Sequence, residues 1–191
     1  IGYVPDNPVF YDKWSVERNL KSFSKFFPKW NFKLQEDLTK RFELDAKQTV
    51  SDLSSGNRTK LSLIIAMAKS PKLLLLDEPT SGLDPIVRRE LLDVLFEFLS
   101  NEERAIFYST HILSEVDRLA DDIAFIKDGS LISVQAKEDL LETYKIVEYK
   151  HGSAGANNVY AFLSKPSAAS VFAYTDNLEQ TVASIANAGG E

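Results

Sequence analysis

The sequence of 191 residues contains no cysteine, which excludes disulfide bonds and zinc sites built on cysteine thiolates. It also lacks any apolar run near the roughly 18 to 20 residues of a membrane-spanning helix, and it shows no secretory signal. The absence of cysteine is typical of a reducing compartment. Any role at a membrane is therefore expected to depend on a partner.

Basic residues are in the minority, with 22 lysines and arginines against 28 acidic residues and a formal net charge of −6. This balance, without a basic stripe in the sequence, disfavours a nucleic-acid-binding surface. Hydrophobic residues make up 44% of the chain, which is enough for one sizeable core. We therefore expect a globular chain that does not bind nucleic acid.

The most informative stretch of the sequence runs from Leu73 to Asp84 and reads LLLLDEPTSGLD. Its four leucines suit a strand buried on both faces of a parallel sheet, which would deliver Asp77 and Glu78 at the carboxyl end, where such sheets bind ligands. There Asp77 can hold a Mg²⁺ ion that bridges nucleotide phosphates, and Glu78 can accept a proton from an attacking water. A buried strand that merely enters an acidic turn is the alternative, and it explains the leucines only.

Two further motifs flank this stretch. Upstream, the segment Leu53-Ser54-Ser55-Gly56-Asn57 precedes a segment with helical apolar periodicity. A helix N-terminus exposes unpaired N–H groups and a positive dipole end, so small residues there allow a phosphate to approach closely. Downstream, Ser109-Thr110-His111 follows the strand-like run 105–108. A histidine after a strand is more often structural, but its place behind the other motifs favours a functional role.

In this order the motifs resemble the signature, Walker B motif, D-loop and switch histidine of ABC-type ATPases. The resemblance implies ATP and Mg²⁺ as cofactors, with Asp77 serving the metal, Glu78 acting as general base and His111 contacting the γ-phosphate. It also implies a pair of nucleotide-binding subunits in which Asp84 links the two sites. The residues that would bind the ATP of the other subunit are those of the signature: Ser54, Ser55, Gly56 and Asn57.

The sequence departs from the family pattern at three positions. Asp6 stands where a Q-loop glutamine is usual; an acid can ligate Mg²⁺ but adds negative charge beside phosphates. The alternative is a turn residue between Pro5 and Asn7, because aspartate favours turns. In the signature, Ser55 replaces a glycine and Asn57 replaces a glutamine, and both keep hydrogen-bonding capacity. We expect function to be retained.

The phosphate-binding pattern G-x-x-x-x-G-K-[ST] of this family is absent, since the chain contains no Gly-Lys pair. The chain also opens without a methionine, in a strand-like segment at Ile1-Gly2-Tyr3-Val4. Together with the resemblance, these observations predict a fragment that lacks the amino-terminal Walker A portion of the domain.

The predicted fold is α/β: a P-loop NTPase (RecA-like) parallel sheet with crossover helices, plus an ABC-type helical subdomain. We expect a strand entering the Q-loop at 1–6, the helical subdomain at 7–70, the catalytic subdomain at 71–143 and an accessory segment at 144–191. Parallel strands are predicted at 73–76, 105–108 and 123–126, with 131–134 antiparallel at the sheet edge after an Asp128-Gly129 turn. In the tail we predict a strand at 159–163 and a helix capped by Asp176, with Leu178, Val182 and Ile185 on one face.

The resemblance implies an ATP-hydrolysing subunit that powers an ABC membrane transporter through ATP-driven dimer closure. Its partners would be transmembrane permease subunits, and it would lie in the cytoplasm on the inner face of the cell membrane. The segment 27–30, FPKW, resembles subunits of antibiotic and drug exporters. Aromatic residues are dense from Phe10 to Phe32; most are expected in the core, while those after the Q-loop are candidates for docking a coupling helix of the permease.

Two other classes of function remain open. A soluble ABC-type ATPase of DNA repair would insert a long coiled coil between Q-loop and signature, and the stretch from Asp6 to Leu53 is too short for one. Translation types usually carry two such domains and a basic linker, neither of which is visible. A catalytically silent interaction fragment is the other alternative, and an upstream Gly-Lys-Ser/Thr segment would decide against it.

Overall fold

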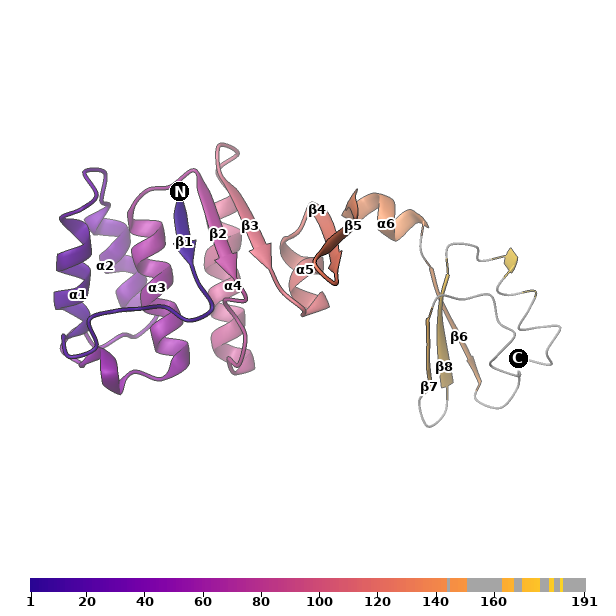
Figure 1. Ribbon diagram of the computed structural model, residues 1–191, viewed down its shortest axis with the longest axis horizontal. Helices are drawn as coiled ribbons and strands as arrows, with labels where there is room; N and C mark the ends of the chain where they lie inside the picture. Colours follow the sequence, from indigo (N-terminus) through magenta and orange to yellow (C-terminus); the bar gives the residue numbers. More distant parts are fainter. Residues whose placement is uncertain (144, 151–162, 167–169, 176–178, 181–182, 184–191) are drawn as a thin grey trace. The chain divides into compact units, whose positions relative to one another are not determined.

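The computed structural model describes residues 1–143, 145–150, 163–166, 170–175, 179–180 and 183 (Figure 1). The chain divides into two compact units, Ile1–Leu119 and Ala120–Glu191. Each unit is described by itself.

The first unit contains a three-stranded parallel sheet in the order β1-β2-β3. Its strands are β1 (Gly2–Val4), β2 (Leu73–Asp77) and β3 (Ala105–Ser109). Leu74 in the central strand lies opposite Gly2 on one side and Ile106 on the other. The predicted strands at 73–76 and 105–108 and their parallel arrangement are confirmed.

Helices occupy both connections of this sheet. The first connection carries α1 (Val16–Ser24), α2 (Phe32–Arg41), the short 3-10 helix η1 (Val50–Asp52) and α3 (Ser55–Ala68); Figure 1 shows the three α-helices side by side. The second carries α4 (Pro85–Leu99), and α5 (Leu113–Leu119) follows β3. The α-helices of the first connection begin where a side-chain oxygen accepts a backbone N–H, at Ser15, Asn31 and Ser54.

Helix α3 lies at the centre of the hydrophobic core. Residues 60–68 are buried on every side of the helix, because α1 and α2 pack against it as well as β1. At Gly2, an added Cβ would lie 2.6 Å from Leu74 Cδ2 and 2.7 Å from the Ala66 carbonyl oxygen. Only glycine therefore allows β1 to approach α3 this closely. The sheet and α3 are fixed to each other, and the ends of both carry predicted site residues.

The second unit begins with an antiparallel hairpin of β4 (Asp122–Lys127) and β5 (Ser130–Ala136). Asp128 and Gly129 connect the strands with positive φ values of 50° and 75°, so the predicted turn is confirmed. The prediction that 123–126 extends the parallel sheet is wrong, because β4 and β5 form a separate two-stranded sheet. A two-residue turn supplies β4 with an adjacent partner at a small cost in loop closure.

The tail contains more strand than the sequence analysis predicts. After α6 (Lys137–Thr143), the strands β6 (Lys145–Lys150), β7 (Leu163–Pro166) and β8 (Ser170–Thr175) form an antiparallel sheet in the order β6-β8-β7. Most of the strand predicted at 159–163, and Asp176, Leu178, Val182 and Ile185 of the predicted helix, lie outside the described residues. In the part of the chain that is described, no helix combines the length and hydrophobicity needed to cross a membrane.

Candidate functional site

The carboxyl ends of β2 and β3 bring the predicted metal ligand and base to one edge of the sheet. Asp77 ends β2 and lies opposite Ser109 at the end of β3. The Ser109 hydroxyl donates to Asp77 Oδ1 at 2.7 Å and accepts the Glu78 backbone N–H at 3.0 Å. One serine therefore holds both acidic residues in place, a role that the sequence analysis missed.

Glu78 has a left-handed backbone with φ of 46°. A non-glycine residue in this region costs roughly 1 to 3 kcal/mol and persists only where neighbouring contacts enforce it. The contacts here are hydrogen bonds from the Glu78 N–H to the Ser109 carbonyl and hydroxyl oxygens, at 3.2 and 3.0 Å. The abrupt turn after β2 directs the chain out of the strand immediately after Asp77.

His111 contacts Glu78 directly, with 2.9 Å between Nδ1 and Oε2. In the tautomer that carries its proton on Nδ1, the imidazole donates to the carboxylate. The Glu78 side chain is 30% exposed and that of His111 is 71% exposed, so both groups are accessible from solvent. The structure thus places together Asp77, Glu78 and His111, which come from two different strand ends.

The signature residues lie at the amino end of α3. Ser54 is the N-cap, and its hydroxyl accepts the Asn57 N–H at 3.2 Å. Ser54 and Ser55 are exposed, whereas Gly56 lies beside the D-loop: an added Cβ would be 3.4 Å from Leu83 Cδ2. The exposed helix end presents the N–H groups and positive dipole that favour an anion.

Asp84, the last residue of the predicted D-loop, caps α4. Its Oδ1 accepts the N–H groups of Ile86 and Val87 at 2.9 and 3.0 Å, and Pro85 occupies the first helical position. The residue therefore has a structural task in its own chain. Since it is exposed, it also remains accessible to another molecule.

Asp6 follows β1 and is exposed. Its Oδ2 accepts a hydrogen bond from the neighbouring Asn7 side chain at 2.6 Å, and the chain bends at these two residues. Its role toward a metal stays a prediction. Within the described ranges, no group of three or more histidine or acidic side chains is arranged to hold a metal ion.

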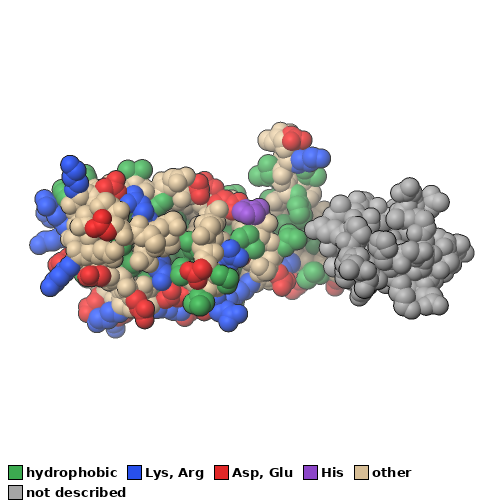
Figure 2. Space-filling view, turned by 90° about the horizontal axis from the view of Figure 1, so that it is seen from below, with side chains coloured by type: hydrophobic (Ala, Val, Ile, Leu, Met, Phe, Trp, Pro, Cys, Tyr) green, Lys and Arg blue, Asp and Glu red, His purple; other side chains and the backbone are tan. Residues whose placement is uncertain are grey.

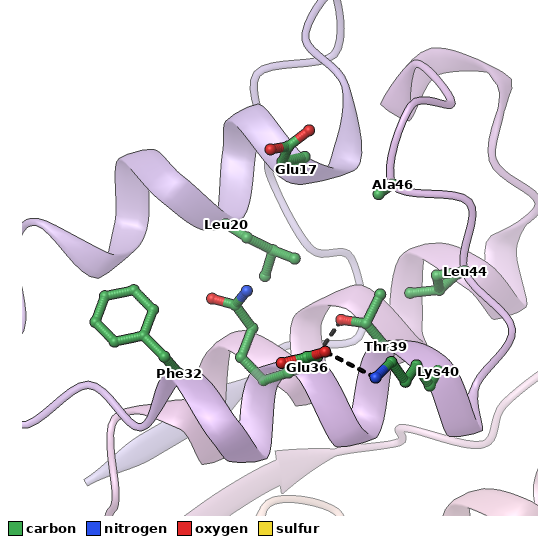
Figure 3. A pocket seen from close by; sticks show the side chains of 9 residues that line it. Glu17, Leu20, Phe32, Glu36, Thr39, Lys40, Leu44 and Ala46 are labelled. Atoms are coloured by element: carbon green, nitrogen blue, oxygen red, sulfur yellow. Dashed lines mark hydrogen bonds and ion pairs between the residues drawn. The ribbon is translucent and has the colours of Figure 1, made fainter.

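Two grooves lie in the helical part of the first unit. One of about 530 Å³ runs between α1 and α2, with Leu20 and Phe32 on the two helices and the Glu36–Lys40 ion pair at its rim (Figure 3). The other, about 290 Å³, is formed by residues after the presumed Q-loop and by α1 with the turn after it: Val9, Phe10, Tyr11, Ser22, Phe23 and Phe26. Neither groove includes the residues at the carboxyl edge of the sheet.

Comparison with known proteins relates these features to a class of protein. Residues 10–117 match the family described as "AAA domain, putative AbiEii toxin, Type IV TA system". Among curated proteins, the chain is 30% identical over 142 residues to the ABC transporter ATP-binding protein YtrB of Bacillus subtilis, across 74% of this chain and 49% of that protein. It is 39% identical over 140 residues to the lantibiotic transport ATP-binding protein SrtF of Streptococcus pyogenes, across 69% of this chain and 58% of that protein.

Solved structures agree in fold. The "ATP binding subunit of ABC transporter" superimposes with a TM-score of 0.65 at 26% identity, covering 73% of this chain and 60% of that chain. For cbiO1 from Clostridium perfringens, part of the ABC transporter complex cbiONQ, the TM-score is 0.59 at 25% identity, covering 73% and 58% of the two chains.

The match over residues 10–117 shows that the chain belongs to this AAA-domain family, and its parallel sheet with crossover helices is the fold of P-loop NTPases. Within that class, the curated proteins to which the chain is 30% and 39% identical are ABC transporter ATP-binding proteins, and the structure that superimposes on it is the ATP-binding subunit of an ABC transporter. It spans about half the length of the curated relatives it matches.

Proposed function

We propose that this chain is the catalytic part of an ATP-hydrolysing subunit that powers an ABC membrane transporter. The observation that carries the proposal is the contact between Glu78 and His111, 2.9 Å apart beside Asp77 at the carboxyl edge of the sheet. Catalysis of phosphoryl transfer needs a metal-bound phosphate, a group that orients or deprotonates water and a group that senses the transferred phosphate. At this edge Asp77 would hold the metal ion, Glu78 would orient and deprotonate the water, and His111 would contact the transferred phosphate.

The residues at this edge fit Mg²⁺ and nucleotide. Mg²⁺ is commonly bound by one or two carboxylates together with substrate phosphates, and Asp77 offers such a carboxylate, oriented by the Ser109 hydroxyl. When bound, the ion would neutralise charge on the phosphates. Glu78 then orients the attacking water and accepts its proton. The imidazolium form of His111, which has a proton on each ring nitrogen, donates to the Glu78 carboxylate through Nδ1 and toward the γ-phosphate through Nε2.

We infer that the signature acts on the ATP of a second nucleotide-binding subunit. The Ser54 hydroxyl is used by its own helix, but the exposed end of α3 still offers N–H groups and a positive dipole to a phosphate. Ser55 and Asn57 add polar side chains there, and Gly56 lets the backbone come close. Because Gly56 lies against the loop that leads to Asp84, the signature and D-loop share one surface for the second subunit.

Transmembrane permease subunits are the proposed membrane partner, and they would hold this chain at the inner face of the cell membrane. The groove formed by Phe10, Tyr11 and α1 supports a docking site, because it is apolar and partly open. Phe10, which lines this groove, is linked to the signature helix, because Arg58 of α3 lies over the Phe10 ring and pairs with Asp12 at 2.9 Å. The likeness to SrtF, named for lantibiotic transport, supports an exporter.

ATP binding tests the proposal. The intact gene product should bind Mg-ATP tightly and hydrolyse it. The 191-residue chain, which has no Gly-Lys pair, should not hydrolyse ATP and should bind it no better than roughly millimolar, or about −4 kcal/mol. Titration calorimetry and a phosphate-release assay measure both. Micromolar binding of ATP to the 191-residue chain would show that this chain binds the phosphates without a Gly-Lys segment. An intact gene product that does not hydrolyse ATP would overturn the ATPase proposal.

A further inference from the structure

Glu115 of α5 is a buried acid that the proposed catalytic roles do not use. It is 1% exposed, and its carboxylate accepts three hydroxyl hydrogen bonds: from Thr80 at 2.5 Å, from Tyr108 at 2.8 Å and from Thr110 at 2.7 Å. The Arg88 guanidinium lies beside it, with 3.5 Å between Nε and Oε1. The carboxylate of Glu115 is thus contacted by one residue from each of four segments: the β2–α4 loop, α4, β3 and the loop after β3.

The partners of Glu115 lie next to the two residues that form the proposed catalytic pair. Thr80 is two residues after Glu78, in a turn closed by hydrogen bonds from the Ser81 N–H to the Glu78 carbonyl oxygen and from the Leu83 N–H to the Thr80 carbonyl oxygen. Thr110 immediately precedes His111. The carboxylate of Glu115 therefore connects the loop that carries Glu78 to the loop that carries His111.

The buried charge of Glu115 is well compensated by its hydrogen-bond partners. An isolated carboxylate in the interior is strongly unfavourable, but three hydroxyl donors and a nearby guanidinium compensate the lost hydration of Glu115. Burial raises the pKa of Tyr108, so its phenol stays protonated at neutral pH and continues to donate. The cluster consequently specifies one arrangement of the two loops.

We propose that Glu115 is a positioning residue that fixes the geometry between Glu78 and His111 by tying Thr80 to Thr110. The inference rests on the proposed ATPase site for its effect on turnover, but the tie between the loops is made by residues of the chain itself. Removing one hydroxyl from the cluster leaves Glu78 and His111 chemically intact and loosens their relative position. A misplacement of about 1 Å in such a pair lowers turnover by up to roughly 100-fold.

The variant Thr110→Val tests the tie on the 191-residue chain without ATP. Valine keeps the shape of threonine and removes the hydroxyl, whereas Thr110→Ser keeps the hydroxyl and serves as the rescue. Amide hydrogen exchange should increase on the order of fivefold at Ser81 and Leu83 in the valine variant, the equivalent of the hydrogen bond lost to Glu115, and should stay at the wild-type rate in the serine variant. The Thr110 hydroxyl also accepts the Ile112 N–H, so faster exchange at Ile112 in the valine variant is expected in any case. A change confined to residues 109–113 would overturn the inference.

The same pair of variants tests positioning in the intact gene product. Thr110→Val should lower kcat by roughly 10- to 100-fold with KM for ATP within about twofold, and Thr110→Ser should restore most of the activity. Thr39→Val is the matched control, because that hydroxyl donates only to the Gln35 carbonyl within α2. Glu115→Gln should behave like Thr110→Val where it folds, since an amide nitrogen cannot accept the hydroxyl protons.

The outcomes separate this inference from the proposed function. If Glu78→Gln abolishes turnover while Thr110→Val leaves kcat within twofold of wild type, the ATPase site stands and the positioning role of Glu115 is overturned. If Glu78→Gln leaves turnover unchanged, the proposed base is wrong, and the exchange experiment alone decides whether Glu115 ties the loops.

Discussion

The carboxyl edge of β2 and β3 and the amino end of α3 carry the two groups of predicted ATP-binding residues, and they are held differently. At the sheet edge, Asp77 and Glu78 are bonded to residues of another strand end, Ser109 and His111. At the end of α3, Ser54 bonds to its own helix, and the serines are exposed. The first region is assembled within one chain, whereas the second presents a polar helix end, to which the proposed second subunit would bring the phosphate.

Charge distribution is consistent with this contrast. On the face shown in Figure 2, acidic and basic side chains are interspersed over the described part of the chain. Specific recognition at the helix end would therefore come from local N–H groups and the helix dipole, which act over short distances, more than from a broad electrostatic field.

The largest expected effect is at the sheet edge. Glu78→Gln keeps the size and hydrogen bonding of the side chain but cannot accept a proton, so turnover in the intact gene product should fall by about 10²- to 10⁴-fold while ATP still binds. Steady-state phosphate release with a parallel binding titration measures both. Glu103→Gln, at an exposed residue paired with Lys72, is the control. Activity within threefold of wild type would mean that Glu78 is not the base.

The next effect separates the two regions. Gly56→Asp should weaken ATP-driven dimerisation by more than about tenfold, because the added carboxylate repels the phosphate of the ATP bound to the other subunit. Folding should be spared, since an acid in the first turn of α3 is favourable to the helix dipole. Gly56→Ala is the control for folding, as its Cβ meets Leu83 and Val87 at ordinary contact distances of 3.4 and 3.8 Å, and without the added charge it should weaken dimerisation less than the aspartate does. Light scattering of the intact product with ATP measures this, and normal dimers of the aspartate variant would contradict a role across the dimer.

A smaller effect concerns the docking groove. Tyr11 is 53% exposed and stacks on Trp14 with ring centroids 4.2 Å apart, so Tyr11→Ala should weaken binding of the permease by about 2 kcal/mol, or roughly thirtyfold, and largely spare folding. The contrasting variant is Leu20→Ala, 3% exposed, which should destabilise the domain by roughly 2 to 5 kcal/mol. Co-purification with the permease and thermal melting distinguish them. A sharp drop in melting temperature for Tyr11→Ala would assign this residue to the core.

The smallest effect tests the two tasks of Asp84. Asp84→Ala removes the cap of α4 and should lower the free energy of unfolding by about 0.5 to 2 kcal/mol, whereas Asp84→Asn keeps a capping oxygen and should change it little. Urea unfolding of both variants measures the difference. If the asparagine variant is stable but loses ATP turnover in the intact product, the charge of Asp84 acts between the two sites; unchanged turnover would restrict the residue to capping.

The elements of the first unit could be predicted because their signals are local. Four leucines before Asp77 indicated the buried strand β2, and the helical apolar periodicity after Asn57 indicated α3. The hairpin turn at Asp128-Gly129 was equally local. The antiparallel strand after that turn was predicted as well, but the sheet to which the hairpin belongs was not: β4 resembles a further parallel strand in sequence, and only the fold showed that β4 and β5 form a sheet of their own.

The sequence by itself determined which residue types stand at the candidate site and in which order, since each motif is a short contiguous string. The tertiary structure alone decided how they are held. Ser109 reaches Asp77 because parallel pairing places two strand ends side by side, and Glu115 meets Thr80 because α5 packs its acid inward. A glutamate on a seven-residue helix carries no sequence signal of burial. Its partner Thr80 lies 35 positions away in the sequence and is brought to it by hydrophobic burial of the sheet and helices around it.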